Sequence, residues 1–244
     1  MGIKTFTTKL SKLNNSGYLR LDTKFNFFVS VKKFSAWQIP NSILLKNVMK
    51  DLLSPTARKG ELDEEYYLVD LSNVERKTNS LKNLVPVTEI GSDKNIISKG
   101  DIAIPKLEPR KGQFFLNLEH KEYLTTTELI EYSIDTALFN PTFLYYTLVT
   151  DNFLEALACL ESGKTHRRVN PDELLRIKIP SLPIKIQDAV VAKIVKLEVE
   201  IKNLKSQIKP DTEVINKVFT AKVGWDTKTF DELSKVHIMN CTLS

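Results

Sequence analysis

The apolar positions of the chain change their spacing several times. Between residues 41 and 53 they recur at helical intervals and Pro55 follows, which predicts a helix at 41–53. The stretch 24–33 alternates loosely and predicts a strand. From residue 66 the apolar residues form short runs separated by turn residues, a pattern typical of strands. Six strands are predicted there, at 66–71, 84–90, 96–97, 101–104, 113–118 and 129–134.

A helical pattern returns at 140–160. Asn140 occupies the N-cap position and Pro141 the first helical position of this predicted helix. Gly163 ends the helix. Residues 170–173 then open a short helical turn, and a strand is predicted at 175–179.

The last pattern along the chain predicts a long helix with a single apolar seam. Its apolar residues recur in steps of four and three that alternate through most of the helix, as in the a and d positions of a coiled coil. Pro210 is expected to kink or break the helix. The seam consists of Ile186, Val190, Ile194, Leu197, Ile201, Leu204 and Ile208.

Together these elements predict an α+β fold with three parts. Residues 1–182 form one globular domain with a mixed β-sheet core and flanking helices. Residues 183–222 form a long C-terminal coiled-coil helix, and residues 223–244 form a tail. A length of 244 residues, of which 42% are hydrophobic, fits one domain with an extension better than two full domains.

The charge balance points first to an acidic partner. The net charge is +5 and the sequence pI is about 9.0, which favours nucleic acid but also occurs in many other soluble proteins. Cys159 and Cys241 are the only cysteines, which fits a reducing cytoplasm. No apolar run reaches the roughly 18 residues of a membrane span, so no membrane association is expected.

Motifs of catalysis are incomplete in this sequence. The NPTF tetrapeptide at 140–143 is similar to the NPP-aromatic motif of adenine-N6 methyltransferases, but Thr142 replaces the second proline. The helix cap at Asn140 explains these residues better. The three histidines lack metal-ligand spacing, so no metal site is predicted. A self-contained enzyme is therefore not expected.

Three basic loops supply the candidate DNA-binding residues. Arginine and lysine on loops can clamp phosphates, and arginine can also bind a guanine edge through two hydrogen bonds. The loops contribute Arg58 and Lys59; Lys106, Arg110 and Lys111; and Lys164, Thr165, His166, Arg167 and Arg168.

The order of parts in residues 96–208 resembles the DNA specificity (S) subunits of type I restriction–modification systems. A Gly100-Asp101-Ile102 strand start precedes a basic loop at 109–112, and a Pro-x-aromatic-Leu-aromatic helix start lies at 141–145. A Gly-basic loop at 163–168 then precedes the strand that ends at Pro180. An exit with Pro183 follows, and Gln187 opens the helix.

This resemblance implies a target recognition domain on a helical spacer, and it implies partners that carry out the chemistry. A methyltransferase (modification) subunit would supply S-adenosylmethionine and a restriction nuclease subunit would join for cleavage. The chain itself would bind double-stranded DNA, without a cofactor and without catalysis. Family members usually carry two such domains and two antiparallel helices, whereas only one of each is found here. A half-length subunit that pairs as a homodimer through the 186–208 seam is therefore expected, with a palindromic target.

Two alternatives stay open. Periodicity and charge alone also fit a non-catalytic protein-interaction module with a coiled-coil dimerisation arm. A stand-alone methyltransferase is a third interpretation, which requires the isolated chain to bind S-adenosylmethionine. The tail shares Asp-Thr-Lys at 226–228 with residues 22–24, so it is either a natural end or the start of a truncated second repeat.

Overall fold

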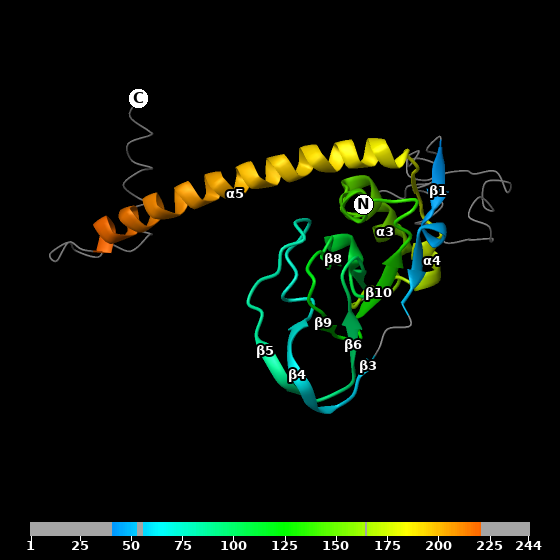
Figure 1. The fold of residues 1–244 in the computed structure, drawn as a ribbon, viewed down its shortest axis with the longest axis horizontal. Helices are drawn as coiled ribbons and strands as arrows, with labels where there is room; N and C mark the ends of the chain where they lie inside the picture. The colour runs from blue at the N-terminus through cyan, green and yellow to red at the C-terminus, as the bar shows by residue number, and fades with distance from the viewer. Residues whose placement is uncertain (1–40, 53–55, 164, 221–244) are drawn as a thin grey trace, which may run out of the picture. The chain divides into compact units, whose positions relative to one another are not determined.

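The computed structural model of the protein describes residues 41–52, 56–163 and 165–220, and these form the expected mixture of helices and sheets (Figure 1). The strand predicted at 24–33 and the tail at 223–244 lie outside the described residues. The chain divides into two compact units, Met1–Val191 and Ala192–Ser244. The described sheets all belong to the first unit, and most of helix α5 (Ile184–Thr220) belongs to the second.

A four-stranded antiparallel sheet forms the centre of the first unit. Its strand order is β2-β10-β7-β8. The strand predicted at 129–134 is confirmed at its predicted bounds, while the strand predicted at 113–118 is shorter in the structure. The members are β2 (Met49–Asp51), β10 (Leu129–Ile134), β7 (Ile102–Pro105) and β8 (Phe115–Leu116).

A five-stranded mixed sheet lies beside it, with the order β3-β6-β9-β4-β5. Strands β4 and β9 are parallel and the other neighbours are antiparallel, which confirms the mixed sheet. Strand β9 is missing from the sequence predictions. The members are β3 (Thr56–Ala57), β6 (Lys94–Ile97), β9 (Tyr123–Thr125), β4 (Gly60–Val69) and β5 (Pro86–Ile90).

Strand β7 joins the two hydrophobic cores of this unit because its residues alternate between opposite faces. Ile102 and Ile104 belong to the larger core, whereas Ala103 belongs to a smaller core that also contains Ile97 and Tyr123. All four residues of β7 are buried. A strand covered on both faces therefore reads as a continuous apolar run rather than as an alternating one.

Three short helices cover the larger core, and their caps follow from the sequence. The Asn140 side chain accepts hydrogen bonds from the backbone N–H groups of Thr142 and Phe143, at 3.0 and 3.2 Å, which confirms the predicted cap. The Asn170 side chain likewise accepts from Asp172 N. The helices are α2 (Pro141–Leu148), α3 (Asp151–Leu160) and α4 (Pro171–Leu175).

The single helix predicted at 140–160 is wrong, because the chain forms two helices there. Thr150 is in an extended conformation and its hydroxyl accepts a hydrogen bond from Phe153 N, so it caps α3. The sequence Thr-Asp at 150–151 is a typical helix start. The continuous apolar periodicity of residues 140–160 hides this boundary.

The helix predicted at 41–53 is also wrong. This segment forms strand β1 (Ser42–Leu44), a 3₁₀ turn η3 (Leu45–Asn47) and strand β2. Strand β1 pairs with β11 (Lys178–Pro180), and β2 pairs with β10. Pairing with distant strands overrides the helical spacing, which still brings Leu45, Val48 and Met49 into the core.

The first residues of helix α5 belong to the first unit, and Gln187 fixes them there. The Gln187 side chain is fully buried and donates to the carbonyls of Leu138 and Leu182, at 3.0 and 2.7 Å. Its Oε1 accepts from Asn140 N at 2.9 Å. The start of α5 is thereby tied to the start of α2.

Of the kink or break expected at Pro210, the break does not occur, because α5 continues without interruption to Thr220 (Figure 1). A proline inside a helix removes one backbone hydrogen bond and crowds the preceding turn. A long helix can absorb this loss by bending rather than by ending.

Candidate nucleic-acid interface

Two of the three predicted basic loops form a single structure, here called the basic unit and made of residues 106–112 and 162–168. Glu108 N donates to Arg167 O at 2.8 Å, and Val169 N donates to Lys106 O at 3.2 Å. Isolated bridges link Arg168 with both Leu107 and Ser162. Segments more than 50 positions apart in the sequence are thus held side by side by their backbones.

Gly163 permits the tight turn of the second loop. Ser162 and Arg168 exchange two backbone hydrogen bonds of 2.9 Å, which bring the two ends of the loop together. Gly163 has a φ of +106°, and a Cβ there would lie 2.8 Å from the carbonyl oxygen of His166. Only glycine fits this position without a shift of the backbone.

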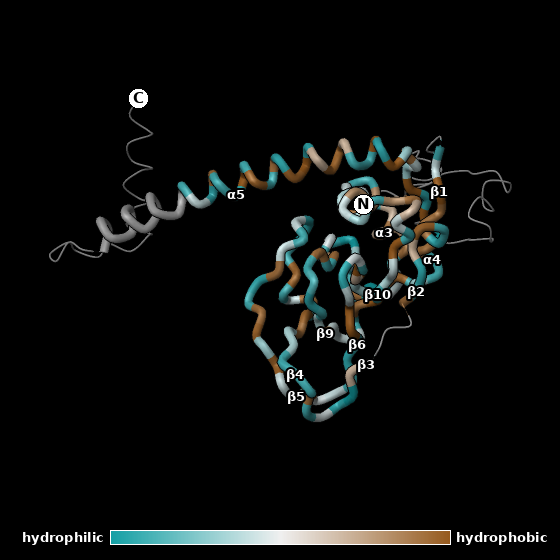
Figure 2. The backbone as a smooth tube through the Cα atoms, viewed as in Figure 1, coloured by the Kyte–Doolittle hydropathy of each residue, from teal (hydrophilic) through white to brown (hydrophobic). Residues whose placement is uncertain are grey.

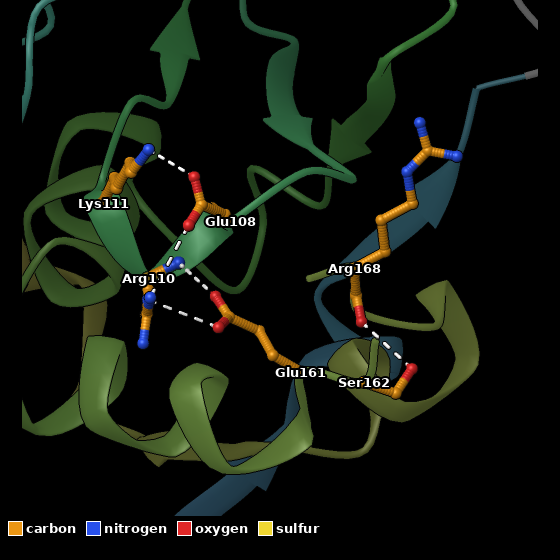
Figure 3. Close-up of polar contacts among 6 residues, drawn as sticks. All are labelled: Glu108, Arg110, Lys111, Glu161, Ser162 and Arg168. Atoms are coloured by element: carbon orange, nitrogen blue, oxygen red, sulfur yellow. Dashed lines mark hydrogen bonds and ion pairs between the residues drawn. The ribbon is translucent and has the colours of Figure 1, made fainter. Parts of the chain in front are cut away.

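Several cations of the basic unit already have carboxylate partners in the protein (Figure 3). Arg110 Nε lies 3.3 Å from Glu161 Oε2, and the Glu161 side chain has no exposed surface. Lys111 pairs with Glu108, and the hydrogen bond from Lys111 is the main cause that lowers the pKa of the Glu108 carboxyl. These pairs therefore shape the first loop as well as giving it charge.

The second loop contains both paired and free groups. Arg168 Nη2 donates to the two carboxylate oxygens of Glu128, at 2.9 and 3.0 Å. Among the described residues, no hydrogen bond or ion pair involves the side chains of Thr165, His166 or Arg167. Lys164 lies outside the described residues. The second loop thus combines polar side chains that have no partner among the described residues with one arginine, Arg168, that is paired with a carboxylate.

Lys106 lies at the edge of the same unit. Its ammonium donates to the carbonyl of Thr127 at 2.7 Å, while its backbone N–H donates to Glu128 O at 2.8 Å. This neighbouring turn also holds the carboxylate that pairs with Arg168. Lys106 is therefore anchored, although one carbonyl leaves two of its three ammonium hydrogens available.

The Arg58–Lys59 turn stands apart from the basic unit. It connects β3 to β4, and both side chains are exposed. Lys59 N donates to Asp93 Oδ1 at 2.8 Å, which ties the turn to the one between β5 and β6. Figure 1 shows β3 and the start of β4 far from α3, which packs on the basic unit. The structure does not join this turn to the other two loops.

A fourth basic segment is absent from the sequence predictions. The loop at 70–85 connects β4 to β5 and carries Arg76, Lys77 and Lys82 on its exposed side. Lys77 N donates to Gly112 O at 2.8 Å, so this loop contacts the basic unit directly. Its sequence ERKTNSLKN combines cations with hydroxyl and amide side chains, as the 163–170 segment does. This composition could have identified the segment as a candidate DNA-binding loop.

The apolar seam of α5 has few partners among the residues that the structure describes. Val190 packs against the larger core of the first unit, and Ile194 is half-buried. Figure 2 shows apolar positions recurring along the described part of α5. The exposed fractions are 49% for Ile186, 56% for Leu197, 51% for Ile201 and 52% for Leu204, and Ile208 lies outside the described side chains.

Other kinds of site find little support in the part of the chain that the structure describes. No group of three His, Cys, Asp or Glu side chains is placed to hold a metal ion there. None of the helices in the same residues combines the length and hydrophobicity needed to cross a bilayer.

The fold is that of type I specificity subunits. An HsdS subunit from Thermoanaerobacter tengcongensis matches with a TM-score of 0.54 at 18% identity, over 78% of this chain and 52% of that chain. A chain from the structure on complex assembly and conformational transition of the type I R-M system matches with a TM-score of 0.55 at 19% identity, over 77% and 51%. The present chain thus spans about half the length of these neighbours.

These likenesses bear out the resemblance of fold that the sequence motifs indicate. No protein-family model matches the sequence, and no curated protein matches it.

Proposed function

We propose that this protein is the sequence-specific DNA-recognition subunit of a type I restriction–modification system. The observation that carries the proposal is the specificity-subunit fold, on which two distant basic loops converge into one surface unit. In this proposal the chain performs no chemistry itself. A partner methyltransferase subunit binds S-adenosylmethionine and methylates adenine, and a partner nuclease subunit restricts unmodified DNA.

The basic unit supports a role in holding the DNA backbone. Thr165, His166 and Arg167 offer donors without partners among the described residues, and a duplex phosphate accepts such donors readily. Arg110, Lys111 and Arg168 keep the two loops in place through their carboxylates, yet still contribute positive potential. Each phosphate contact removed should reduce the slope of log K against log salt concentration by about one.

The Arg58–Lys59 turn would belong to a separate contact. It is followed by an acidic strand, with Glu61, Asp63 and Glu64 within the next five positions. These carboxylates weaken the local attraction for phosphate. Removal of Arg58 and Lys59 should therefore reduce DNA affinity less than removal of Arg167 and Lys106.

The exposed seam of α5 supports a second part of the proposal, that two chains pair through residues 186–208. Leu197, Ile201 and Leu204 are each about half exposed and lie on one face, which a second helix can cover. An antiparallel pair related by a two-fold axis presents two identical recognition domains. The DNA target is then palindromic with a spacer. The proposal also includes a cytoplasmic localisation, where such a subunit would meet its DNA and its partners.

The first test is co-expression of the chain with its genomically adjacent methyltransferase, followed by methylation of a random-sequence DNA library. We expect a stable complex that methylates adenine at one bipartite palindrome. Methylation of an asymmetric site would keep the recognition function and overturn the homodimer. Absence of both assembly and sequence preference would contradict the proposal and favour the protein-interaction module, for which the exposed seam is the supporting observation.

A further inference from the structure

The loop at 70–85 combines length, exposure and fixed shape. It connects β4 to β5 and its described residues form no helix or strand, apart from one bridge between Val74 and Leu81. Loops of this length without secondary structure are uncommon in compact domains, and those that are ordered usually serve a function. Glu75, Arg76 and Lys82 are exposed on it.

Two half-buried amide side chains hold the loop on the rest of the first unit. Asn79 Nδ2 donates to Leu116 O at 3.0 Å, and Asn79 Oδ1 accepts from Leu116 N at 2.8 Å. Gln113 Nε2 donates to the carbonyls of Leu71 and Val74, at 2.8 and 3.0 Å. Asn79 thus makes the pair of hydrogen bonds to Leu116 that a neighbouring strand would make, and Gln113 fixes the backbone of the loop. A loop with a fixed backbone loses less conformational entropy when it binds a ligand.

Gly112 connects this loop to the basic unit. It has a φ of +68°, and a Cβ there would lie 3.1 Å from Lys77 Cγ and 3.2 Å from Leu154 Cδ1. The glycine therefore lets residue 77 approach the 106–112 loop closely enough for the Lys77–Gly112 hydrogen bond. The two loops are consequently positioned as one surface.

The charged groups of the loop differ from those of the basic unit. Lys77 pairs with Asp151 at 2.6 Å, but within the described residues no ion pair involves Arg76 or Lys82. The loop also carries Glu75, and the Asp70 carboxylate is used by the N–H groups of Ser72 and Asn73. Its net charge is small, with three cations and two carboxylates. Such a loop is poorly suited to clamp phosphates by charge alone.

The side chains suit the edges of bases instead. Arginine binds guanine O6 and N7, asparagine binds adenine N6 and N7, and glutamate accepts from cytosine N4. The exposed residues Arg76, Asn83 and Glu75 provide one of each type. We infer that the 70–85 loop is the element that reads bases, with Arg76 as a specificity-determining residue, while the adjoining basic unit holds the phosphates. This inference rests on the proposed function.

The test compares Arg76→Ala and Asn83→Ala with Lys50→Ala, a matched exposed substitution on β2 that the inference assigns no role. Each chain is co-expressed with the adjacent methyltransferase, and the methylated motif is read from a random-sequence DNA library. We expect Arg76→Ala to relax the preference at one base pair by about tenfold or more. Neighbouring positions of the motif and the salt dependence of binding should not change, and Lys50→Ala should behave as the unsubstituted chain.

Each other outcome has a distinct meaning. An unchanged motif in both Arg76→Ala and Asn83→Ala would overturn base reading by this loop and leave the proposed function intact. Equal weakening on all sequences, with the salt slope reduced by about one, would make Arg76 a phosphate contact and also overturn the inference. If the unsubstituted chain directs no methylation at all, the proposed function fails and the inference with it.

Discussion

At the scale of single residues, the Arg110–Glu161 pair contributes more to stability than an exposed ion pair. The Glu161 carboxylate is fully enclosed, while 36% of the Arg110 side chain is exposed. Replacing Glu161 by glutamine leaves the guanidinium with only its longer contact to Glu108 Oε1, at 3.6 Å, at a partly desolvated site. We expect Glu161→Gln to lower the free energy of unfolding by about 1–3 kcal/mol, measured by urea denaturation.

The Arg168–Glu128 pair provides the matched control for this prediction. Its side chains are 55% and 44% exposed, so the pair is screened by water. Glu128→Gln should change the free energy of unfolding by less than about 1 kcal/mol. A loss as large as that of Glu161→Gln would show that burial does not distinguish the two pairs.

Asp101 gives a prediction about pH. Partial burial raises the pKa of its carboxyl, although the hydrogen bond from Ser98 N opposes this. The folded protein then holds the proton more tightly than the unfolded chain, so its stability falls as pH rises from the unfolded pKa through the folded pKa. Asp101→Asn lacks this loss because its side chain carries no charge.

Asp101→Asn should therefore be more stable than the unsubstituted chain at pH 7, by less than about 1 kcal/mol because the site is only half-buried. The advantage should shrink as the pH falls below the ordinary aspartate pKa of about 3.9, because the carboxyl then becomes protonated in both states. Thermal melting across this pH range measures it. A constant difference at all pH values would contradict the role of the raised pKa.

At the scale of elements, α5 presents an apolar face that the described part of the chain leaves largely uncovered. Leu197→Glu combined with Ile201→Glu places two charges on that face, and charges at a and d positions disrupt helix pairing. We expect the dimer dissociation constant to rise by about 100-fold or more, as each buried charge costs well over 1.4 kcal/mol. Sedimentation equilibrium measures the change.

Lys193→Glu combined with Lys202→Glu is the control for the same helix, because both positions lie off the seam and are exposed. This variant changes charge more strongly than the seam variant but should leave the dimer in place. The seam variant should also keep the melting temperature of the first unit, since Leu197 and Ile201 are about half exposed. Equal dissociation in both variants would mean that charge, rather than the apolar face, decides pairing.

Local signals explain which elements could be predicted. The Asn140 cap with Pro141 and the strand at 129–134 each depend on neighbours in the sequence, so their positions follow from it. Residues 42–51 could not be assigned in this way. Their strands exist because β11 and β10 offer backbone partners from distant parts of the chain, and a helical spacing of apolar residues does not record that pairing.

The candidate interface divides along the same line. The composition of the 106–112 and 163–168 segments marks them as basic loops, and the chain alone allows that much to be predicted. Their union could not be predicted, because it depends on backbone bonds such as the one between Glu108 and Arg167. Nor could the carboxylates of Glu128 and Glu161 be foreseen as partners, since they belong to elements 40 and 51 positions away from the cations they bind.

At the scale of the whole molecule, the length of the paired helix should set the distance between two recognition domains. The chain spans about half the length of its structural neighbours, so a two-fold pair would restore two domains. Duplicating residues 194–200 adds one heptad and keeps the seam on one face. At 1.5 Å per residue, the separation of the two domains grows by about 10 Å, which corresponds to about three base pairs.

We therefore expect the heptad duplication to lengthen the spacer of the methylated palindrome by about three base pairs while both half-sites stay the same. Inserting only two residues is the control, because it rotates the rest of the seam by about 200° and should abolish pairing. Methylation of a random-sequence library by each complex measures the spacer. An unchanged spacer in the heptad variant would show that α5 does not set the separation, even if the recognition of each half-site is as proposed.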